Sequence, residues 1–310
     1  MGYLSTIIIL GGISVIAALG VAILTGYTGM FSIGNAGFMA LGGYMAAVLN
    51  MRFGVPFLPA VLLGGLFAGA CSLLIGFPTF RSRLTGDYFA IATFGFSEAI
   101  RLLIVNSKHP WINGAIGLSG IPMLTDLGNT LAITLGAVLL AHAFVTSQYG
   151  KNCIAISQDV TAAEMMGVNV LKTKLLALFI SAFYAGVAGG MLGFYFAYLT
   201  PSLFNITRSS DLLAAVVFGG MQSLIGPIIA AFVLVAVPQL LYAFNAWRLV
   251  VYGLVFVLVM VFRPQGLLGY TDMNFAFLRT WWFAIRRRVG RKAVSNAASD
   301  AAAGKGAGHE

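Results

Sequence analysis

The stretch "LLALFISAFYAGVAGGMLGFYFAYLTPSLFNIT", residues 175–207, contains no Asp, Glu, Lys or Arg. A helix needs about 20 apolar residues to cross the hydrocarbon core of a bilayer, so this stretch is long enough for one span. Four further segments lack charged residues in the same way: 1–51, 53–80, 127–150 and 212–247. They are continuously apolar, without the alternation of a transmembrane β-barrel or the polar helix faces of a soluble core. The sequence therefore predicts an all-α polytopic membrane protein.

The composition supports this class and sets the expected span count. Hydrophobic residues make up 59% of the chain and charged residues 9%, whereas soluble domains carry about 25% charged residues. One predicted segment, 211–225, is short, carries Gly219 and Gly220 and ends at Gly226-Pro227. Such a segment is typical of a broken helix lining a pathway or of close helix packing. The nine predicted spans are 4–24, 29–49, 56–77, 86–105, 126–147, 174–199, 211–225, 226–244 and 248–262.

Lysine and arginine residues set the expected orientation and domain division. Most of the 18 basic residues lie near residue 81, beside a polar insert at 157–169, or after the last span. Because such residues favour the cytoplasmic side, we expect the insert and the C-terminus in the cytoplasm. Residues 1–270 would form the transmembrane domain, and residues 271–310 a basic, partly disordered tail. The net charge of the chain is +9, but much of it lies in this tail, where basic residues suit anionic lipid. We therefore expect no nucleic-acid partner.

The polar insert "SQDVTAAEMMGVN", Ser157 to Asn169, has the sequence of a short capped helix. Asp159 can accept hydrogen bonds from first-turn amides and is a good N-cap. Val160–Met166 would then form about two turns, and Gly167 would supply the left-handed residue after the helix. The sequence therefore predicts a cytoplasmic helix between two spans.

The exact start and the docking surface of this helix stay open. Thr161 and Glu164 also have the spacing of a capping box. Met165 and Met166 offer adaptable apolar surface. A helix of this length is not stable alone in water, so it must rest either on its own bundle or on a separate soluble subunit.

The insert and its flanks resemble inner-membrane permeases of branched-chain amino acid ABC importers (LivM type). The resemblance covers roughly residues 16–269 in matching order. The segments that carry it are "GYTGMFSIGNAGFMALGGYMAAVL" (26–49), "RLTGDYFAIATFGFSEAIRLL" (83–103), "YGKNCIAISQDVTAAEMMGVNVLKTKLLALFISAFYAGVAGGMLGF" (149–194), "VVFGGMQSLIGPIIAAFVL" (216–234) and "RPQGLLG" (263–269).

The resemblance implies a multi-pass subunit of the bacterial inner membrane that forms half of a translocation pathway for branched-chain or other hydrophobic amino acids. Its partners would be a homologous second permease, two ATP-binding subunits and a periplasmic solute-binding protein. The insert would be the coupling helix that contacts the ATP-binding subunit. The residues expected in that contact are Asp159, Ala162, Ala163, Glu164, Met165 and Gly167.

The chain itself is expected to be a transport subunit without catalytic residues or a cofactor. It contains no G-x-x-x-x-G-K-[ST] phosphate-binding loop, so ATP and Mg would bind to the partner subunits. His109 and His142 have no partners at metal-ligand spacing, and we expect no metal site. The chain departs from the family pattern at Ile154, Ser157 and Gln265, where basic residues are usual, and only partly matches it in "INGAIGLSGIP".

Polar and small residues in the second span are candidates for the translocation pathway. Ser32, Asn35 and Gly37 lie together, and Asn35 can both donate and accept hydrogen bonds to a zwitterionic solute. The same residues could instead hold helices together. Gly219 and Gly220, in the interrupted segment, are candidates on the same grounds.

Thr93 and Glu98 are the candidates in the segment 86–105. A carboxylate within a span is a functional candidate by default, although Glu98 lies one turn from Arg101 and the two could form a structural pair. Asp211 follows Arg208 near the outer end of the interrupted segment, where we expect a cap or an ion pair.

Other transport classes remain to be weighed against the ABC permease. Within the same family, import of urea or short amides is the nearest alternative. An ion-coupled secondary transporter would use Glu98 as the coupled acid and would show an inverted repeat, which the sequence does not clearly contain. A passive channel would need a filter or ring of charge, and none is evident.

Overall fold

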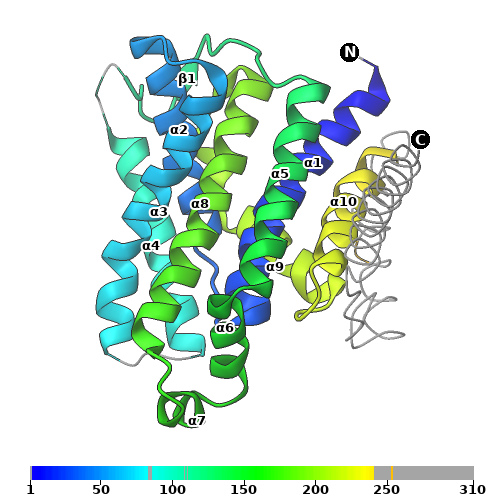
Figure 1. Cartoon of the computed structure of the whole chain (residues 1–310). Helices are drawn as coiled ribbons and strands as arrows, with labels where there is room; N and C mark the ends of the chain where they lie inside the picture. The colour runs from blue at the N-terminus through cyan, green and yellow to red at the C-terminus, as the bar shows by residue number, and fades with distance from the viewer. Residues whose placement is uncertain (1, 83–85, 108, 110, 241–252, 254–310) are drawn as a thin grey trace, which may run out of the picture. The chain divides into compact units, whose positions relative to one another are not determined.

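The computed structural model describes residues 2–82, 86–107, 109, 111–240 and 253, and within them the chain is a bundle of α-helices (Figure 1). Two short strands and two short non-α helices complete the described elements. In chain order the elements are α1 (Tyr3–Val21), the π-helix η1 (Ala22–Tyr27), α2 (Asn35–Phe53), α3 (Phe57–Arg81), α4 (Asp87–Asn106), β1 (Leu118–Ser119), α5 (Leu127–Thr146), α6 (Gln148–Gln158), α7 (Val160–Met165), α8 (Val170–Phe196), β2 (Tyr198–Leu199), the 3-10 helix η2 (Pro201–Phe204), α9 (Ile206–Gly219) and α10 (Ile225–Leu240).

The described helices agree with most of the predicted spans. Five are long and apolar enough to cross a bilayer: α1 with its continuation η1, and α3, α4, α5 and α8. The helix α2 corresponds to the second predicted span, and α9 and α10 to the two segments on either side of the predicted interruption. The ninth predicted span, 248–262, and the tail, 271–310, lie outside the described residues.

The prediction was wrong for the beginning of the second span. Residues 29–34 have no regular secondary structure, and α2 begins only at Asn35. Gly29 adopts a left-handed conformation, with φ of +71°, which ends the preceding π-helix. Non-helical backbone is tolerated at membrane depth where protein surrounds it, and Ser32 and Asn35 are fully buried.

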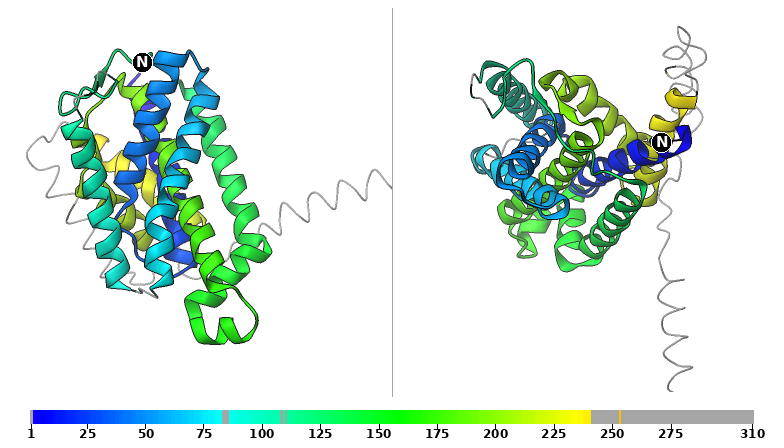
Figure 2. Two further views of the ribbon diagram at one scale, coloured as in Figure 1. Left: turned by 90° about the vertical axis from the view of Figure 1, so that its left-hand side faces the viewer. Right: turned by 90° about the horizontal axis from the view of Figure 1, so that it is seen from above.

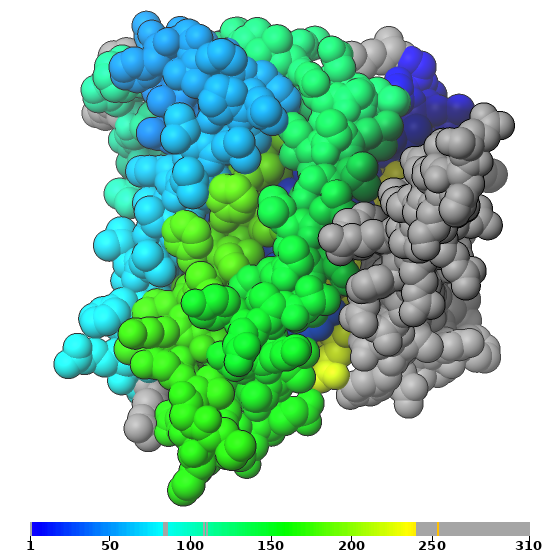
Figure 3. Space-filling view, in the orientation of Figure 1, coloured from blue at the N-terminus to red at the C-terminus, as the bar shows by residue number. Residues whose placement is uncertain are grey.

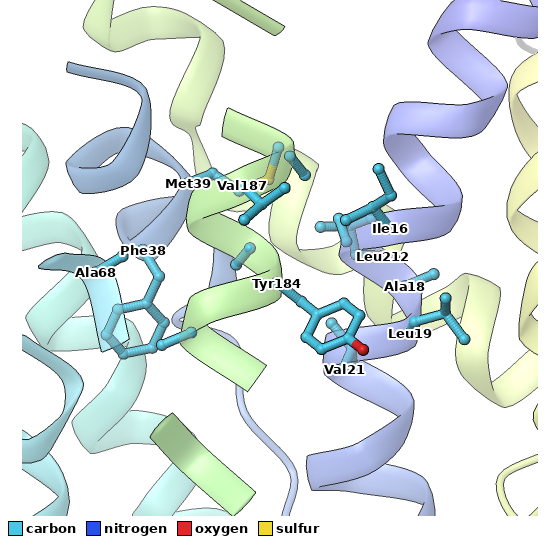
Figure 4. Close-up of a cluster of buried hydrophobic side chains, with 14 of the residues drawn as sticks. Ile16, Ala18, Leu19, Val21, Phe38, Met39, Ala68, Tyr184, Val187 and Leu212 are labelled. Atoms are coloured by element: carbon cyan, nitrogen blue, oxygen red, sulfur yellow. The ribbon is translucent and has the colours of Figure 1, made fainter. Parts of the chain in front are cut away.

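The core of the bundle lies around α8, which packs against α1, α2 and α3. Figure 4 shows Tyr184 and Val187 of α8 between Leu19 of α1 and Phe38 of α2. By contrast, α4 and α5 are mostly exposed, as expected for helices at the edge of one subunit. The Tyr184 hydroxyl donates a hydrogen bond to the Ala137 carbonyl of α5 (2.9 Å), which ties that peripheral helix to the core.

Small residues allow α2 and α8 to approach closely. A Cβ atom at Gly189 of α8 would overlap the carbonyl oxygen of Met39, and a Cβ at Gly42 of α2 would overlap the backbone of Gly186. Close backbone approach through small residues is the usual way in which helices pack in a membrane, where there is no hydrophobic drive between them. The glycines of these two helices therefore set the geometry of the core.

The two ends of the bundle differ in structure. At one end α7 projects beyond the neighbouring helices, and the N-terminal end of α1 lies at the other (Figures 1 and 2). At the end opposite α7, β1 pairs antiparallel with β2, with Leu118 opposite Leu199. The loop before α5 is fixed there too, since the Thr125 hydroxyl donates to the Met191 carbonyl (3.0 Å).

Candidate functional site: a projecting helix and two interrupted segments

The helix α7 is capped at its start by Asp159, as predicted. The Asp159 carboxylate accepts hydrogen bonds from the backbone N–H groups of Thr161 (2.7 Å) and Ala162 (3.1 Å). This places the helix start at Val160. A side chain that satisfies these amides stabilises such a helix by about 1 kcal/mol.

The end of α7 is closed by the predicted left-handed glycine. Gly167 has φ of +83°, its N–H donates to the Glu164 carbonyl (3.0 Å), and the N–H of Val168 donates to the Ala163 carbonyl (3.0 Å). The helix ends at Met165, one residue earlier than predicted, and Met166 is its C-cap. Backbone groups at both ends of α7 are thus hydrogen-bonded to residues of the same segment, 159–168.

The outer surface of α7 is apolar and open. Met165 and Met166 are each 85% exposed, whereas Ala163, on the inner side, is 4% exposed. Figure 3 shows the green segment around α7 projecting from the end of the molecule. Two adjacent methionines with this exposure form an adaptable apolar contact surface; Met166 was not among the predicted site residues.

A groove of about 360 Å³ separates α7 from the adjoining ends of α3 and α8. Glu164 lines it from α7, Arg81 from α3 and Lys174 from α8. Lys174 is 7% exposed, and its ammonium group interacts electrostatically with the Glu164 carboxylate. One acidic and two basic side chains therefore line the groove between α7 and the bundle.

The sequence did not predict α6, although this helix holds α7 in place. The hydroxyl of Ser147 caps it by accepting from the Gly150 N–H (3.4 Å). On its inner face Cys153 is fully buried, and near its end a Cβ atom at Gly29 would lie 3.4 Å from the Cβ of Ser157. The two helices thus form a short arm that touches the interrupted segment before α2.

The structure brings together four of the predicted pathway residues. The Ile33 N–H donates to the Thr93 hydroxyl of α4 (3.3 Å), and the Asn35 amide donates to the Ser32 carbonyl (3.1 Å). A Cβ atom at Gly37 would lie 2.7 Å from the Cα of Ser97, so α2 and α4 are in close contact there. Ser32, Asn35, Gly37 and Thr93 therefore form one buried polar cluster.

Two features of this cluster could not be read from the sequence. The N–H of Ala36 donates to the hydroxyl of Ser209 (2.8 Å), so a residue of α9 satisfies the first turn of α2 across 173 positions. The Asn35 Oδ1 atom is buried and has no hydrogen-bond partner among the described residues. A buried acceptor of this kind is costly to leave unpaired, so this oxygen is available to a donor from outside the described residues.

Glu98 lies apart from this cluster and pairs within α4. The Arg101 guanidinium donates from Nε to both carboxylate oxygens of Glu98 (3.0 Å each), and its Nη2 also contacts the carboxylate. The side chains of Arg101 and Glu98 are 28% and 35% exposed. This geometry favours the structural interpretation of the pair.

We expect Glu98→Gln to leave the pH dependence of solute uptake unchanged. Uptake should fall by less than about fivefold, because a partly exposed ion pair contributes about 1 kcal/mol or less. The measurement is uptake of labelled solute between about pH 5.5 and 8, the range in which a carrier acid would titrate, by cells carrying either variant. A proton-coupled carrier would instead lose its pH profile when the coupled acid is neutralised, and that result would contradict the assignment.

Gly219 and Gly220 form the second interruption, between α9 and α10. Gly220 has φ of +110°, which reverses the chain, and a Cβ atom at Gly219 would overlap the backbone of Gly226. Gly219 is therefore packed closely against the start of α10, as the close-packing interpretation predicts. A Cβ at Gly26 would overlap the Met221 carbonyl, so the turn also touches η1, next to the first interruption.

The prediction for Asp211 was wrong, because this residue neither caps α9 nor forms a direct ion pair with Arg208. The N-cap of α9 is Asn205, whose side chain accepts from the Arg208 N–H (3.1 Å), and not Asp211. Asp211 and Arg208 interact electrostatically, but they do not form an ion pair within 4.0 Å; in the described part of the chain, Arg101–Glu98 is the one pair that does.

A bundle of apolar helices of spanning length, two interrupted segments and one capped helix projecting from an end define a polytopic membrane permease. The sequence model described as "Branched-chain amino acid transport system / permease component" matches residues 3–260. The chain belongs to this family.

Curated relatives agree with this family. The high-affinity branched-chain amino acid transport system permease protein LivM of Escherichia coli is 33% identical over 293 residues, which cover 84% of this chain and 68% of LivM. LivH of the same organism, named for the same transport system, is 28% identical over 145 residues, 46% of this chain and 47% of LivH. The E. coli xylose transport system permease protein XylH is 26% identical over 159 residues, 47% of this chain and 40% of XylH.

Proposed function

We propose that this chain is one of two membrane subunits of an ATP-driven importer in a bacterial inner membrane, and that it forms half of a pathway for branched-chain or other hydrophobic amino acids. The observation that carries the proposal is α7, a helix whose ends are capped locally and whose two methionines are 85% exposed. A helix of six residues is not stable alone in water, and exposed apolar surface of this kind marks a docking site.

The partner of α7 would be an ATP-binding subunit in the cytoplasm. Two such subunits would bind ATP and Mg and would hydrolyse the nucleotide, and their closure would move α7. The arm of α6 and α7 would pass this motion to the interrupted segment at 29–34, which it meets where Ser157 packs against Gly29. On this proposal the end of the bundle with α7 would face the cytoplasm. The C-terminus would lie on the same side, as the distribution of basic residues predicts.

A homologous permease would complete the pathway, and a periplasmic solute-binding protein would deliver the solute. The similarity of this chain to both LivM and LivH, two permease proteins named for one E. coli transport system, supports a paired arrangement. The exposed faces of α4 and α5 offer surface for such a pairing. The cluster of Ser32, Asn35, Gly37 and Thr93 would lie on the route of the solute, with the turn at Gly219 and Gly220 beside it.

The test of the proposal is the variant Glu164→Arg in the assembled transporter. We expect uptake of labelled leucine to fall at least about tenfold, because the charge reversal places a second cation opposite Lys174 and misorients the helix. Hydrolysis of ATP should continue but should no longer respond to the loaded solute-binding protein.

The matched control is Asp126→Arg, the same change of an exposed acid at the opposite end of the bundle. It should insert equally well and keep at least half of wild-type uptake. Wild-type uptake by Glu164→Arg, or ATP-independent uptake by the purified chain alone, would contradict the proposed function.

A further inference from the structure

A cavity of about 320 Å³ lies in the half of the bundle farther from α7. Its walls come from α1, α2, α8, α9 and α10, and near its outer end the Tyr3 hydroxyl contacts the Gln239 carbonyl. This volume lies in the range of pockets that hold small ligands, about 300–1,000 Å³. A smaller cavity of about 60 Å³ adjoins it and shares Ser14 and Arg208 with it.

Most of the cavity wall is apolar, and one guanidinium group points into it. The apolar side chains include Leu10, Met39, Phe196 and Phe204. The exception is Arg208 of α9, whose Nη2 donates to the hydroxyl of Ser14 on α1 (3.3 Å). An arginine carries five N–H donors, and among the described residues Ser14 supplies the one acceptor within reach of this side chain.

A carboxylate lies one helical turn further along the same helix. Asp211 lines the smaller cavity together with Arg208, and the two side chains interact electrostatically. They are not joined in a direct ion pair, although residues three apart on a helix are close enough to form one. An Arg and an Asp inside a bundle of membrane-spanning helices are costly unless they pair with each other or with another group.

We propose that this cavity is a solute subsite of the permease for a zwitterionic α-amino acid with an aliphatic side chain. The inference rests on the proposed function and adds to it a location and the residues that would bind the two charged groups. Arg208 would bind the α-carboxylate through its planar pair of donors, and the apolar wall would hold the aliphatic side chain. Asp211 lines the smaller adjoining cavity, and there it would accept from the α-ammonium group.

The charges at this site distinguish an amino acid from the other solutes considered for this family. A neutral solute such as urea or a sugar can form hydrogen bonds with an Arg and an Asp, but it brings no charge of its own to either group. An amino acid brings one charge for each group, and its removal from water is then compensated by two charge-assisted hydrogen bonds.

The experiment compares the complete transporter, with its partner subunits and loaded solute-binding protein in proteoliposomes, with three variants. Arg208→Gln/Asp211→Asn removes both charges, so that neither is left unpaired in the fold. Arg208→Lys keeps the charge and removes the planar donor pair. Arg52→Gln, at an exposed position at the end of α2, is the matched control for the loss of a cation.

We expect the double variant to take up leucine roughly tenfold more slowly at saturating solute-binding protein, since two charge-assisted contacts are lost. The amount of ATP-binding subunit that co-purifies with the double variant should equal that of the wild type, which shows that the variant folds and assembles. Arg208→Lys should give an intermediate rate, and Arg52→Gln the wild-type rate. The transporter in nanodiscs, without the solute-binding protein, should bind leucine, and the double variant should not.

Two probes separate the roles of the charges. In nanodiscs, the wild-type transporter should bind leucine more tightly than isoamylamine, which lacks the carboxylate, and more tightly than 4-methylpentanoate, which lacks the ammonium group. Arg208→Lys should mainly reduce the preference for leucine over isoamylamine. Asp211→Asn should mainly reduce the preference for leucine over 4-methylpentanoate. Preferences that do not change with these substitutions would overturn the subsite.

The outcomes distinguish this inference from the proposed function. If the wild-type complex couples ATP hydrolysis to leucine uptake and the double variant shows unchanged uptake and binding, the subsite is wrong and the proposed function stands. If the wild-type complex shows no ATP-dependent uptake, the proposed function fails, and loss or retention of leucine binding in nanodiscs by the double variant still decides the subsite.

Discussion

The double substitution Met165→Asp/Met166→Asp is expected to abolish ATP-dependent uptake while the chain still folds and inserts. Both side chains are 85% exposed in the subunit, so replacing them removes no contact of the fold. In an assembled transporter they would be buried against the ATP-binding subunit. Burial of a methionine contributes about 1.5–3 kcal/mol, so the affinity for that subunit should fall by a factor of about 100 or more.

The measurement is uptake of labelled leucine together with the amount of ATP-binding subunit that co-purifies with the permease. The control is Met165→Leu/Met166→Leu, which keeps apolar surface of similar size and should retain most of the activity. An aspartate variant that assembles and transports like the wild type would show that α7 rests on nothing in the working complex.

The second large effect is expected from Gly189→Val in α8. A Cβ atom at this position would overlap the carbonyl oxygen of Met39 in α2, so the two helices must separate. We expect a loss of about 3 kcal/mol or more in stability, the upper range for overpacked cores. The measurement is the yield of monodisperse protein after detergent extraction and the midpoint of thermal unfolding.

The control for this substitution is Gly136→Val in α5. No atom lies within 4 Å of a Cβ atom at that glycine, so the same change of residue should alter the yield and the unfolding midpoint little. Equal yield and midpoint for Gly189→Val and the wild type would mean that α2 and α8 pack less closely than this overlap requires.

Local signals made much of the fold predictable from the sequence. Runs without charge longer than a bilayer is thick predicted most of the spans, because length and apolarity alone decide that a segment can cross. Asp159 and Gly167 predicted both ends of α7, since a cap and a left-handed glycine act within one turn of chain. The interruption at Gly219 and Gly220 was visible for the same reason.

Features that depend on distant parts of the chain were not predictable in this way. The apolar run that contains residues 29–34 reads as helix, and only the structure shows that Thr93 and Ser209 satisfy the backbone there. Similarly, nothing in the sequence placed Arg208 beside Ser14, because the contact joins positions 194 apart. Periodicity and capping rules contain no information about such pairs.

The segment before α2 is tied to other helices by few hydrogen bonds. Ile33 donates to Thr93 of α4, and Ala36, in the first turn of α2, donates to Ser209 of α9. On its other side, a Cβ atom at Gly29 would lie 3.4 Å from the Cβ of Ser157 on α6. If α7 moves as proposed, the displacement of α6 would therefore reach this segment directly, and a change in two side-chain hydroxyl contacts would be enough to free it from α4 and α9.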